Sequence, residues 1–198
     1  MAEGAIKLVV GLGNPGEEYA RTRHNAGYWF VERLAAQASA PWKRDSRHQC
    51  EVSRAGVGGV DLRLQKPTTF MNRSGAAVQS LAAFHRVAPA EILVVHDEID
   101  LPPGTARLKF GGGHGGHNGL RDVIACLGAE FWRLRLGVGH PGHRDQVVDA
   151  VLSRASRDEQ GLIDAALERA LDVLPQFVGG QQQQAMHQLH SGPVPARE

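Results

Sequence analysis

Short apolar runs rich in β-branched residues alternate along this chain with longer segments in which apolar residues recur every three or four positions. The runs have the length and composition of buried strands, and the longer segments have the period of amphipathic helices. Strands are expected at residues 5–10, 51–57, 60–65, 92–96, 105–110 and 131–138, and helices at residues 24–40, 74–86, 120–127, 145–152 and 156–177. This alternation predicts an α/β fold: a single layered domain with a twisted, mostly parallel mixed sheet flanked by helices.

The length and composition of the chain fit one domain. Its 198 residues, 42% of them hydrophobic, are enough for one sizeable core and few for two. We expect residues 1–180 to form this domain. The remaining stretch, QQQQAMHQLHSGPVPARE at residues 181–198, is polar and low in complexity, which predicts a mobile C-terminal tail.

The charges are nearly balanced, with 22 Lys and Arg against 21 Asp and Glu, so nucleic-acid binding would require a local patch. Cys50 and Cys126 lie far apart, which argues against a disulfide framework and against a zinc site. No basic start precedes a long apolar core, and no window approaches the roughly 20 apolar residues of a membrane span. A cytoplasmic protein is expected, and a monomer, because no long apolar stripe is left over.

The pattern G-x-G-x-x-G directly follows the first apolar run and is formed by Gly11, Gly13 and Gly16. It is typical of a dinucleotide phosphate loop, in which a helix opens within the turn and holds the pyrophosphate. Here Pro15 lies inside the turn, and the next helical pattern begins only near His24. The acid required at the end of a second strand is missing, since Glu32 lies within a helical pattern. We therefore interpret these glycines as turn residues.

Four polar residues stand just beyond predicted strands. Asn14 follows the first strand and Asn72 the second strand of a hairpin, while Asp97 ends the run at residues 92–96. Asn118 closes the glycine-rich stretch after residues 105–110. Ligands of α/β sheets bind beyond the carboxyl ends of the strands, so parallel strands would gather all four side chains, with His24 beside them.

Each of these residues also has an ordinary structural explanation as a helix cap, a turn former or a core histidine. The set favours function, because it combines one His, one Asp and three Asn without a candidate nucleophile. In such a set a neutral imidazole can take a proton from water, while a carboxylate fixes its tautomer. Amide groups can donate to the developing oxyanion. The chemistry indicated is water-mediated cleavage of an acyl bond.

A metal site is the competing hypothesis for six residues, His96, Asp97, Glu98, Asp100, His114 and His117. The pair His114 and His117 lies in a run of glycines, and no third ligand is spaced to complete a tetrahedron. We therefore expect neither a metal nor a cofactor.

The segment at residues 111–119 contains six glycines in nine positions, which forfeits both helix and strand propensity. It is either a mobile gate or a place where backbone closely approaches a ligand. Basic residues surround it in the sequence: Arg107, Lys109, Arg133, Arg135, His140, His143 and Arg144. On one surface they would form a phosphate-binding patch.

Five segments together resemble the bacterial peptidyl-tRNA hydrolase family: GLGNPGEEYARTRHNAG, KPTTFMNRSG, HDEIDLPPG, GGGHGGHNGLRD and FWRLRLGVGHPG. The resemblance extends from about Ile6 to the last long helix and preserves the order and approximate spacing of the motifs. It implies a single-domain, metal-free α/β hydrolase. Such an enzyme cleaves the ester between a peptide and the terminal ribose of tRNA, and so recycles tRNA from prematurely released chains.

The resemblance also implies roles for individual residues. His24 would activate water, Asp97 would orient it, and Asn14 would position the substrate and favour blocked over free aminoacyl groups. The peptidyl end and the terminal nucleotide would contact Tyr19, Phe70, Asn72 and Asn118, with Met71 and His117 lining the same cleft. Residues 111–116 would form a gate and residues 140–151 a lid. The basic positions near the tRNA phosphates are matched by Arg107, Lys109 and Arg135.

Two other hypotheses remain at this stage. One is an RNA-binding module with a dormant site, because some relatives of this fold bind RNA in splicing without hydrolysing it. The presence of His24, Asp97 and the three asparagines argues for activity. The other is a nucleotide-dependent oxidoreductase, which Pro15 and the missing acid disfavour.

Overall fold

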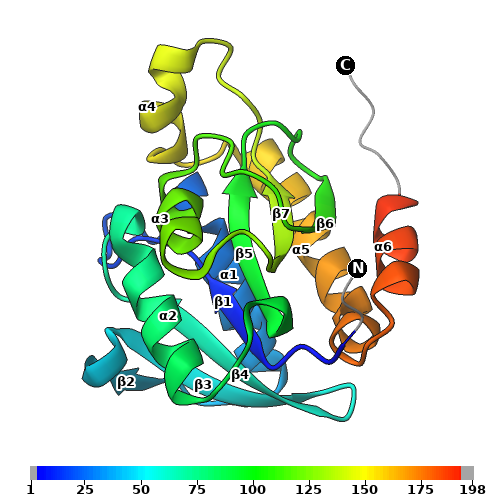
Figure 1. Ribbon diagram of the computed structural model, residues 1–198. Helices are drawn as coiled ribbons and strands as arrows, with labels where there is room; N and C mark the ends of the chain where they lie inside the picture. Colours follow the sequence, from blue (N-terminus) through cyan, green and yellow to red (C-terminus); the bar gives the residue numbers. More distant parts are fainter. Residues whose placement is uncertain (1–3, 193–198) are drawn as a thin grey trace.

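The computed structural model describes residues 4–192 and shows one seven-stranded sheet in the order β2-β3-β4-β1-β5-β7-β6, flanked by helices (Figure 1). Its strands are β1 (Leu8–Gly11), β2 (Lys43–Asp45), β3 (Cys50–Val57), β4 (Val60–Pro67), β5 (Ile92–Glu98), β6 (Ala106–Phe110) and β7 (Trp132–Gly137). The pairs β4–β1, β1–β5 and β5–β7 are parallel, and the pairs nearer the edges are antiparallel. The predicted α/β fold with a mixed sheet is confirmed.

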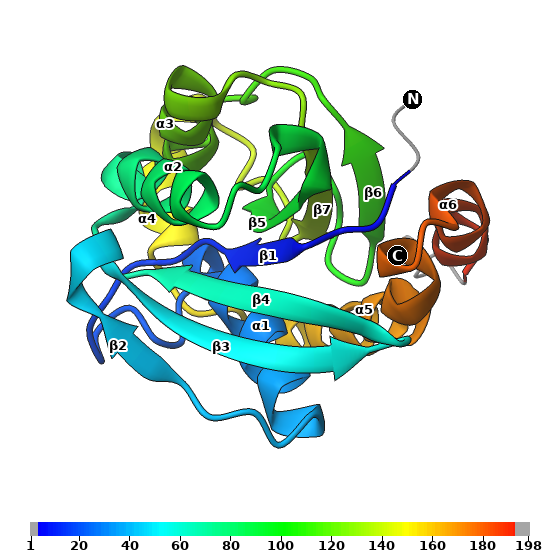
Figure 2. The same cartoon turned by 60° about the horizontal axis from the view of Figure 1, so that its bottom comes forward.

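Two helical layers enclose the sheet (Figure 2). One contains α1 (Ala26–Gln37) and α5 (Arg157–Val178), and the other contains α2 (Ser74–Phe84) and α3 (Asn118–Leu127). Successive residues of β1 pack into different layers, Val9 into the first and Leu8 and Val10 into the second. Because both faces are covered, β1 and the first four residues of β5 are continuous apolar runs, and this makes them recognisable in the sequence.

Two local signals in the sequence correspond to the observed turns and caps. Gly58 and Gly59 join β3 to β4 with φ values of 55° and 80°, the left-handed conformation that a two-residue hairpin turn requires. At the start of α5, Ser156 Oγ accepts a hydrogen bond from the Glu159 amide at 3.2 Å, and Glu159 Oε2 accepts one from the Ser156 amide at 3.0 Å. The predicted hairpin and capping box are both confirmed.

Strand β2 is an element that periodicity does not predict. Its three polar residues follow a segment without apolar alternation, and they pair with β3 in the register Lys43↔Val52. The unpaired backbone groups along the free edge of β3 attract a neighbouring strand whatever its side chains are. Tertiary context, and not propensity, therefore makes this segment a strand.

The glycines after β1 are needed mainly for close packing. A Cβ atom on Gly11 would lie 2.3 Å from the carbonyl oxygen of Gly27, and one on Gly27 would lie 2.3 Å from that of Val95. A Cβ atom on Gly13 would lie 2.6 Å from the ring of Tyr28. Among the three glycines of the pattern, only Gly16 has a positive φ, 106°. The turn interpretation is thus wrong for Gly11 and Gly13, which let α1 approach the ends of β1 and β5.

Strand β6 runs antiparallel to β7, with Phe110 opposite Trp132, so it ends at the amino ends of the parallel strands. The expectation that Asn118 follows a parallel strand is wrong. Trp132 is level with Leu93 on β5, and Asp97 lies four residues beyond, about 13 Å along the strand. The glycine-rich loop at residues 111–117 carries the chain back over this distance to the carboxyl ends.

The expected polar tail is not what the structure shows for residues 182–190, which form helix α6 (Gln182–His190) beside β6 (Figure 1). Ala185 and Leu189, four residues apart on one helix face, are buried in the core of the α5 side. Gln182 donates hydrogen bonds to the carbonyl oxygens of Gly4 and Phe177, at 2.6 and 3.1 Å. Tertiary burial therefore makes this glutamine-rich segment a helix, while residues 193–198 lie outside the described part.

Shorter helices complete the chain. Helix α4 (Val147–Val151) projects from the body at the carboxyl ends of the strands, and single 3₁₀ turns lie at Arg23–Asn25, Ser46–His48, Met71–Arg73, Pro89–Glu91 and Arg144–Gln146 (Figure 1). Among the helices of residues 4–192, none combines the length and the apolar character that a membrane crossing requires.

Candidate active site

A cleft of about 660 Å³ opens at the carboxyl ends of the parallel strands, beneath α4. All predicted site residues except Arg107, Lys109 and Arg135 line it, namely Asn14, Tyr19, His24, Phe70, Met71, Asn72, Asp97, His117 and Asn118. These residues come from loops and element ends that are far apart in the sequence. The carboxyl ends of the parallel strands lie at one edge of the sheet, and the glycine loop returns the chain to the same edge, so these residues come together there.

His24 and Asp97 form the centre of the cleft floor. Nδ1 of His24 lies 2.9 Å from both carboxylate oxygens of Asp97. Both side chains are buried, with 11% and 2% of their surface exposed. In the neutral ring Nδ1 donates to the carboxylate, which leaves Nε2 with a free lone pair. This tautomer is the one a general base requires.

Burial is the largest single effect on the pKa of His24 and lowers it, but the charge and hydrogen bond of Asp97 together raise the pKa above its ordinary value. For Asp97 burial favours the neutral acid, and the charges and hydrogen bonds of His24 and His117 outweigh it, so the carboxyl pKa is lowered. Asp97 is therefore a carboxylate at neutral pH. It favours the imidazolium that His24 becomes after taking a proton.

His117, which directly precedes α3, binds the same carboxylate. Its Nε2 lies 2.8 Å from Asp97 Oδ1, while its Nδ1 accepts a hydrogen bond from the Leu120 amide at 3.2 Å and so caps α3. The cap identifies Nδ1 as the acceptor and Nε2 as the proton donor. Asp97 is thus held between two donating imidazoles, whose ring centroids are 4.8 Å apart.

The same three side chains, His24, Asp97 and His117, form a group that could hold a metal ion, with ligand atoms within 4.8 Å of one another. Metal–ligand bonds to imidazole and carboxylate are about 2.0–2.2 Å long. The separations of 2.8 and 2.9 Å are those of hydrogen bonds, and both nitrogens that face the carboxylate bear protons in the arrangement just described. Hydrogen bonding within the group accounts for its geometry, and the metal-free site stays a prediction.

A third histidine, His96, supports this arrangement without adding charge. Its Nδ1 lies 2.7 Å from the carbonyl oxygen of Asp97, and its ring contacts that of His117 with centroids 5.1 Å apart. Burial, followed by the charge of His117, lowers the pKa of His96 to about 3, so the ring is neutral. The sequence presents His96 as a possible metal ligand, whereas the structure shows it packed behind Asp97.

Asn14 is fixed in the floor by Asn25, a residue that sequence reasoning did not select. The Asn14 amide donates to Asn25 Oδ1 at 2.8 Å, and Asn25 Nδ2 donates to the Asn14 carbonyl at 3.0 Å. Asn14 Oδ1 in turn accepts from the Met71 amide at 2.7 Å. Its oxygen is therefore occupied, and its NH₂ group is the donor left for a ligand. The only signal for Asn25 in the sequence is an amide side chain directly after His24.

Asn72 and Asn118 do not cap helices, which was the structural alternative for both. His117 caps α3, and Asn118 is the first residue of that helix. Asn72 lies in the 3₁₀ turn Met71–Arg73. Both residues are exposed, and within residues 4–192 neither side chain makes a hydrogen bond. Their amides are available to a ligand in the cleft.

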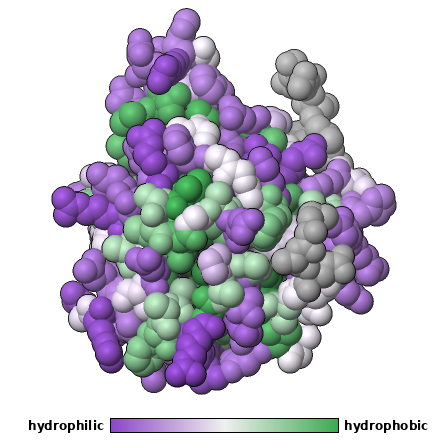
Figure 3. All heavy atoms as spheres, viewed as in Figure 1, coloured by the Kyte–Doolittle hydropathy of each residue, from purple (hydrophilic) through white to green (hydrophobic). Residues whose placement is uncertain are grey.

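Aromatic and apolar side chains form the rim of the cleft. Phe70 is 59% exposed and meets Tyr19 edge to face, with ring centroids 6.4 Å apart. On the opposite side, α4 presents Val148, 60% exposed, and an apolar patch lies on the lower part of this projection, beneath hydrophilic residues (Figure 3). An exposed aromatic ring such as that of Phe70 suits stacking with a base.

Arg23, next to His24, anchors the root of the α4 segment. Its guanidinium donates to the carbonyl of Ala150 at 3.1 Å, to Ser153 Oγ at 2.7 Å and to Glu159 at 3.0 Å. The segment expected to be a lid is therefore tied to the 3₁₀ turn that carries the histidine. The sequence contains no signal for this contact, which joins residues more than 120 positions apart.

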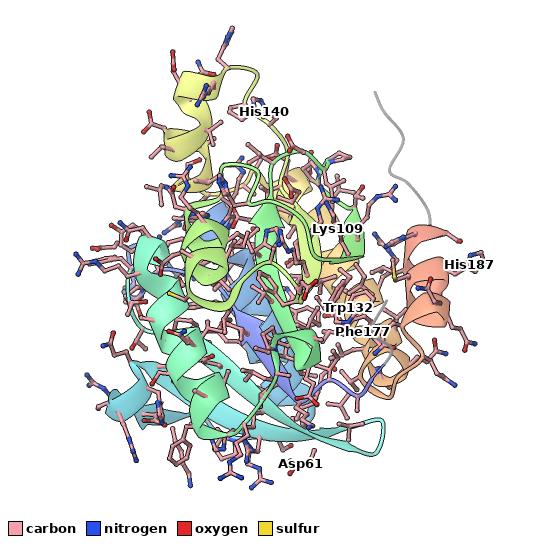
Figure 4. All side chains as sticks on the ribbon, in the orientation of Figure 1. Asp61, Lys109, Trp132, His140, Phe177 and His187 are labelled. Carbon is pink, nitrogen blue, oxygen red and sulfur yellow. The ribbon has the colours of Figure 1, made fainter. Side chains whose placement is uncertain are left out.

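The basic residues divide into two kinds. Arg107 and Lys109 are exposed on β6, and Arg107 stands opposite Arg135, which is paired with Glu98 at 3.1 Å (Figure 4 labels Lys109). Arg133 is only 2% exposed, so its expected place in a phosphate patch is wrong. Its guanidinium instead donates to the carbonyls of Gly112 and Gly113 at 2.5 Å and stacks on Phe131 at 4.6 Å. Arg133 holds the glycine loop where it crosses β7.

Comparison with known proteins agrees with this geometry. The family model for peptidyl-tRNA hydrolase matches residues 8–197. A peptidyl-tRNA hydrolase of Acidithiobacillus ferrooxidans is 55% identical over 185 residues, 93% of this chain and 98% of the relative. One of Pseudomonas aeruginosa is 56% identical over 189 residues, 94% and 97% of the two chains. The crystal structure of peptidyl-tRNA hydrolase from Acinetobacter baumannii superposes with a TM-score of 0.92 at 50% identity, covering 94% of this chain and 95% of that one.

The fold and the cleft define a hydrolase of the α/β class, with a buried histidine–aspartate pair at the carboxyl ends of its strands. The chain belongs to the peptidyl-tRNA hydrolase family.

Proposed function

We propose that the chain hydrolyses the ester bond between a peptide, or an N-blocked amino acid, and the 3′-terminal ribose of tRNA, and so recycles tRNA from prematurely released peptidyl-tRNA. His24 is the general base and Asp97 its orienting partner. The observation that carries this assignment is the pair of 2.9 Å contacts from His24 Nδ1 to Asp97, on the floor of the cleft. They leave Nε2 as the nitrogen that can take a proton from water.

In the first step a water molecule bound at Nε2 of His24 attacks the ester carbonyl carbon and gives its proton to the ring. The carbonyl oxygen becomes an oxyanion and His24 becomes an imidazolium, which the Asp97 carboxylate stabilises. In the second step the bond from the carbonyl carbon to the ribose oxygen breaks, and the imidazolium returns its proton to that oxygen. The products are a peptide carboxylic acid and tRNA with a free terminal hydroxyl.

Asn14 supplies a fixed donor for the substrate carbonyl. Its side-chain oxygen is occupied by the Met71 amide at 2.7 Å, so its NH₂ group cannot turn away without losing that bond. A preorganised amide donor of this kind contributes roughly 10²- to 10³-fold to acyl transfer. The same neutral donor favours the carbonyl of an N-blocked residue over a free ammonium group, which is itself a charged donor.

The rim would bind the terminal nucleotide and the peptide. Asn72 and Asn118 offer exposed amides, and Tyr19 and Phe70 offer rings for stacking. Met71 lines the floor beside α3, where its sulfur lies 2.5 Å from the place of a Cβ atom on Gly119. Farther out, Arg107, Lys109 and Arg135 would contact tRNA phosphates from β6 and β7. The glycine loop and the α4 segment would act as gate and lid.

The decisive experiment measures release of an N-acetylated amino acid from its tRNA by the purified protein in the presence of a chelator. Unblocked aminoacyl-tRNA is the substrate control, and His24→Ala is the test variant. His187→Ala is the matched control, because His187 is exposed on α6, away from the cleft (Figure 4). We also expect a monomer in light scattering.

We expect cleavage of the blocked substrate in chelator, loss of turnover by roughly 10²- to 10⁴-fold in His24→Ala, and no change in His187→Ala. The affinity of His24→Ala for tRNA should stay close to that of the unaltered chain. An inactive unaltered chain that still binds tRNA would replace this proposal by a pure binding function. Activity that chelator abolishes would assign His24, Asp97 and His117 to a metal.

A further inference from the structure

A second groove, of about 360 Å³, opens between the β2–β3–β4 part of the sheet and the C-terminal end of α2. Arg63 on its wall is level with Leu8 and Ile92, at the amino ends of the parallel strands. Asp97 lies five residues beyond Ile92 on β5, about 17 Å along the strand. The groove is thus at the opposite end of the sheet from the catalytic cleft. In Figure 4, Asp61, the partner of the groove residue Arg54, lies at the bottom, and His140, which lines the catalytic cleft, lies at the top.

Two arginines of the groove wall are cross-strand neighbours. Arg54 on β3 and Arg63 on β4 are directly opposite each other and project on the same face. Like charges at such a pair destabilise a sheet. Asp61 balances Arg54 through a salt bridge, but among residues 4–192 Arg63 has no ion pair. Lys43 on β2, also without an ion pair in the described part, completes the basic wall.

His85, at the end of α2, faces these cations across the groove. Burial, and then the charges of Arg63, His48 and Arg54, lower the pKa of its imidazole, while Asp45 opposes them. The groove lining contains the cations Lys43, Arg54 and Arg63 against one carboxylate, Asp45, and Arg54 is balanced by Asp61, so one positive charge remains in excess here although the whole chain has a net charge of only +1. A negatively charged ligand would relieve this concentration of positive charge.

An exposed aromatic ring stands beside the groove. Phe84, 54% exposed, precedes His85 on α2. The guanidinium of Arg47 lies 5.0 Å from its ring centroid, and the rings of His48 and His85 lie 5.1 and 4.9 Å away. These neighbours hold the phenyl ring in place and leave about half of its surface to solvent. A positioned ring next to a basic channel is how proteins bind single-stranded nucleic acid without reading its sequence.

We propose that this groove binds a single-stranded RNA segment, distinct from the acceptor end that enters the catalytic cleft. Lys43 and Arg63 contact two backbone phosphates, and Phe84 stacks with a base. The planar guanidinium group of arginine can donate two hydrogen bonds to one phosphate. The exposed ring favours RNA over an acidic peptide, which has no bases to stack. The separation of about 17 Å along the strands keeps the segment apart from the scissile ester. This assignment does not depend on the catalytic roles proposed above.

The test is fluorescence anisotropy of the full chain with a labelled uridine dodecamer, which lacks the acceptor sequence, over a series of salt concentrations. The variants are Lys43→Glu and Phe84→Ala, both at exposed positions. The matched control is Arg44→Glu. Arg44 is adjacent to Lys43 and carries the same charge, but side chains alternate along a strand, so it projects from the other face, opposite Glu51.

We expect Lys43→Glu to weaken binding about tenfold and to reduce the salt slope by about 0.7, the value for one lost contact to a single strand. Phe84→Ala should weaken binding about fivefold or more. Arg44→Glu should change affinity less than about twofold. A dodecamer with 5-iodouridine should photo-crosslink to Phe84. All three variants should cleave a short N-acetylaminoacyl acceptor-end substrate at the normal rate, which shows that they fold.

Several results would overturn the proposal. One is no measurable binding of the dodecamer, and another is an equal loss in Arg44→Glu and Lys43→Glu. A polyglutamate peptide that binds as tightly as the RNA would show that the groove takes acidic chains in general. His24→Ala should bind the dodecamer normally, so failure of the catalytic assignment and failure of this one are separate outcomes.

Discussion

The floor and the rim of the catalytic cleft are built in opposite ways. On the floor, His24, Asp97 and Asn14 are buried, and each side chain is held by hydrogen bonds of 2.7–2.9 Å, which leave only His24 Nε2 and the Asn14 NH₂ group for a ligand. On the rim, Asn72 and Phe70 are exposed, and the side chain of Asn72 has no hydrogen bond within the described residues. The floor side chains are therefore positioned before any ligand binds, whereas the rim side chains would be positioned by the ligand itself.

This difference corresponds to two functions, stabilising the transition state and binding the substrate. A group that must act in the transition state gains most from being positioned in advance, because no reorganisation is then needed during the reaction. A group that binds a large ligand gains from being exposed and adaptable. Changes to the floor should therefore reduce kcat, whereas changes to the rim should raise KM.

Asp97→Asn is expected to cause the largest loss. An amide cannot balance the imidazolium, and it can favour the wrong tautomer of His24, so kcat should fall roughly 10²- to 10⁴-fold. Asp97 holds the pKa of His24 above its ordinary value, and only the neutral ring acts as a base. The rate should therefore rise with pH through that raised pKa, and the midpoint should move to lower pH in the variant.

The measurement is the pH dependence of kcat/KM, which reports the free enzyme, for both proteins. An unchanged midpoint in Asp97→Asn would mean that Asp97 does not control the protonation of His24.

Asn25→Ala is expected to cause the next largest loss of activity. It removes the two hydrogen bonds that hold the backbone of Asn14, and should lower kcat by about 10- to 100-fold through misplacement of that donor. Unfolding free energy should fall by about 1–3 kcal/mol, because buried backbone groups lose their partners. Steady-state kinetics and denaturant titration check both effects.

Asn72→Ala is its rim counterpart, and should raise KM while changing unfolding free energy by less than about 0.5 kcal/mol. Similar stability losses in the two variants would remove the distinction between floor and rim.

Arg133→Met tests the anchor of the glycine loop. Its two bonds to Gly112 and Gly113 are charge-assisted, each on the order of 1.5–3 kcal/mol, so amide exchange at residues 111–116 should accelerate about tenfold or more. Hydrogen-exchange mass spectrometry is the measurement. Arg107→Met is the control, since Arg107 is exposed on β6 and should leave exchange unchanged. Faster exchange in both variants would indicate a general loosening of the sheet edge.

Phe70→Ala should have the smallest effect, a rise in KM of about fivefold with kcat unchanged, because one stacked base is lost. Phe84→Ala is matched to it, with 54% exposure against 59%, and should not change KM for a short acceptor-end substrate. A fall in kcat for Phe70→Ala would place Phe70 with the floor.

Much of the fold could be predicted from local pattern. The buried strands β1 and β5 begin as apolar runs, apolar residues alternate with arginine along β7, the Gly58-Gly59 turn determines a hairpin, and Ser156 with Glu159 starts a helix. Each of these signals acts between residues close in sequence. Pattern failed for β2 and α6, whose polar segments become regular only through pairing with β3 and burial of Ala185 and Leu189.

The members of the candidate site and their gathering at the carboxyl ends of the strands were predictable, but most of the contacts that hold them were not. Resemblance of five motifs pointed to the side chains that line the cleft, and the structure brings them together. It did not point to Asn25, Arg23 or the internal role of Arg133, whose contacts reach across the fold. A hydrogen bond between distant residues leaves no periodic trace in a sequence.

By itself, then, the sequence determined the fold class, the family and the identities of the polar side chains, because apolar period, turn residues and motifs are local properties of the chain. Tertiary structure alone decided that β6 runs against β7, so that a glycine loop must return Asn118 to the carboxyl ends. It also decided that Asp97 lies between two imidazoles, at 2.9 Å from His24 and 2.8 Å from His117. Strand direction and shared hydrogen bonds depend on burial and pairing over the whole molecule, which no single stretch of sequence contains.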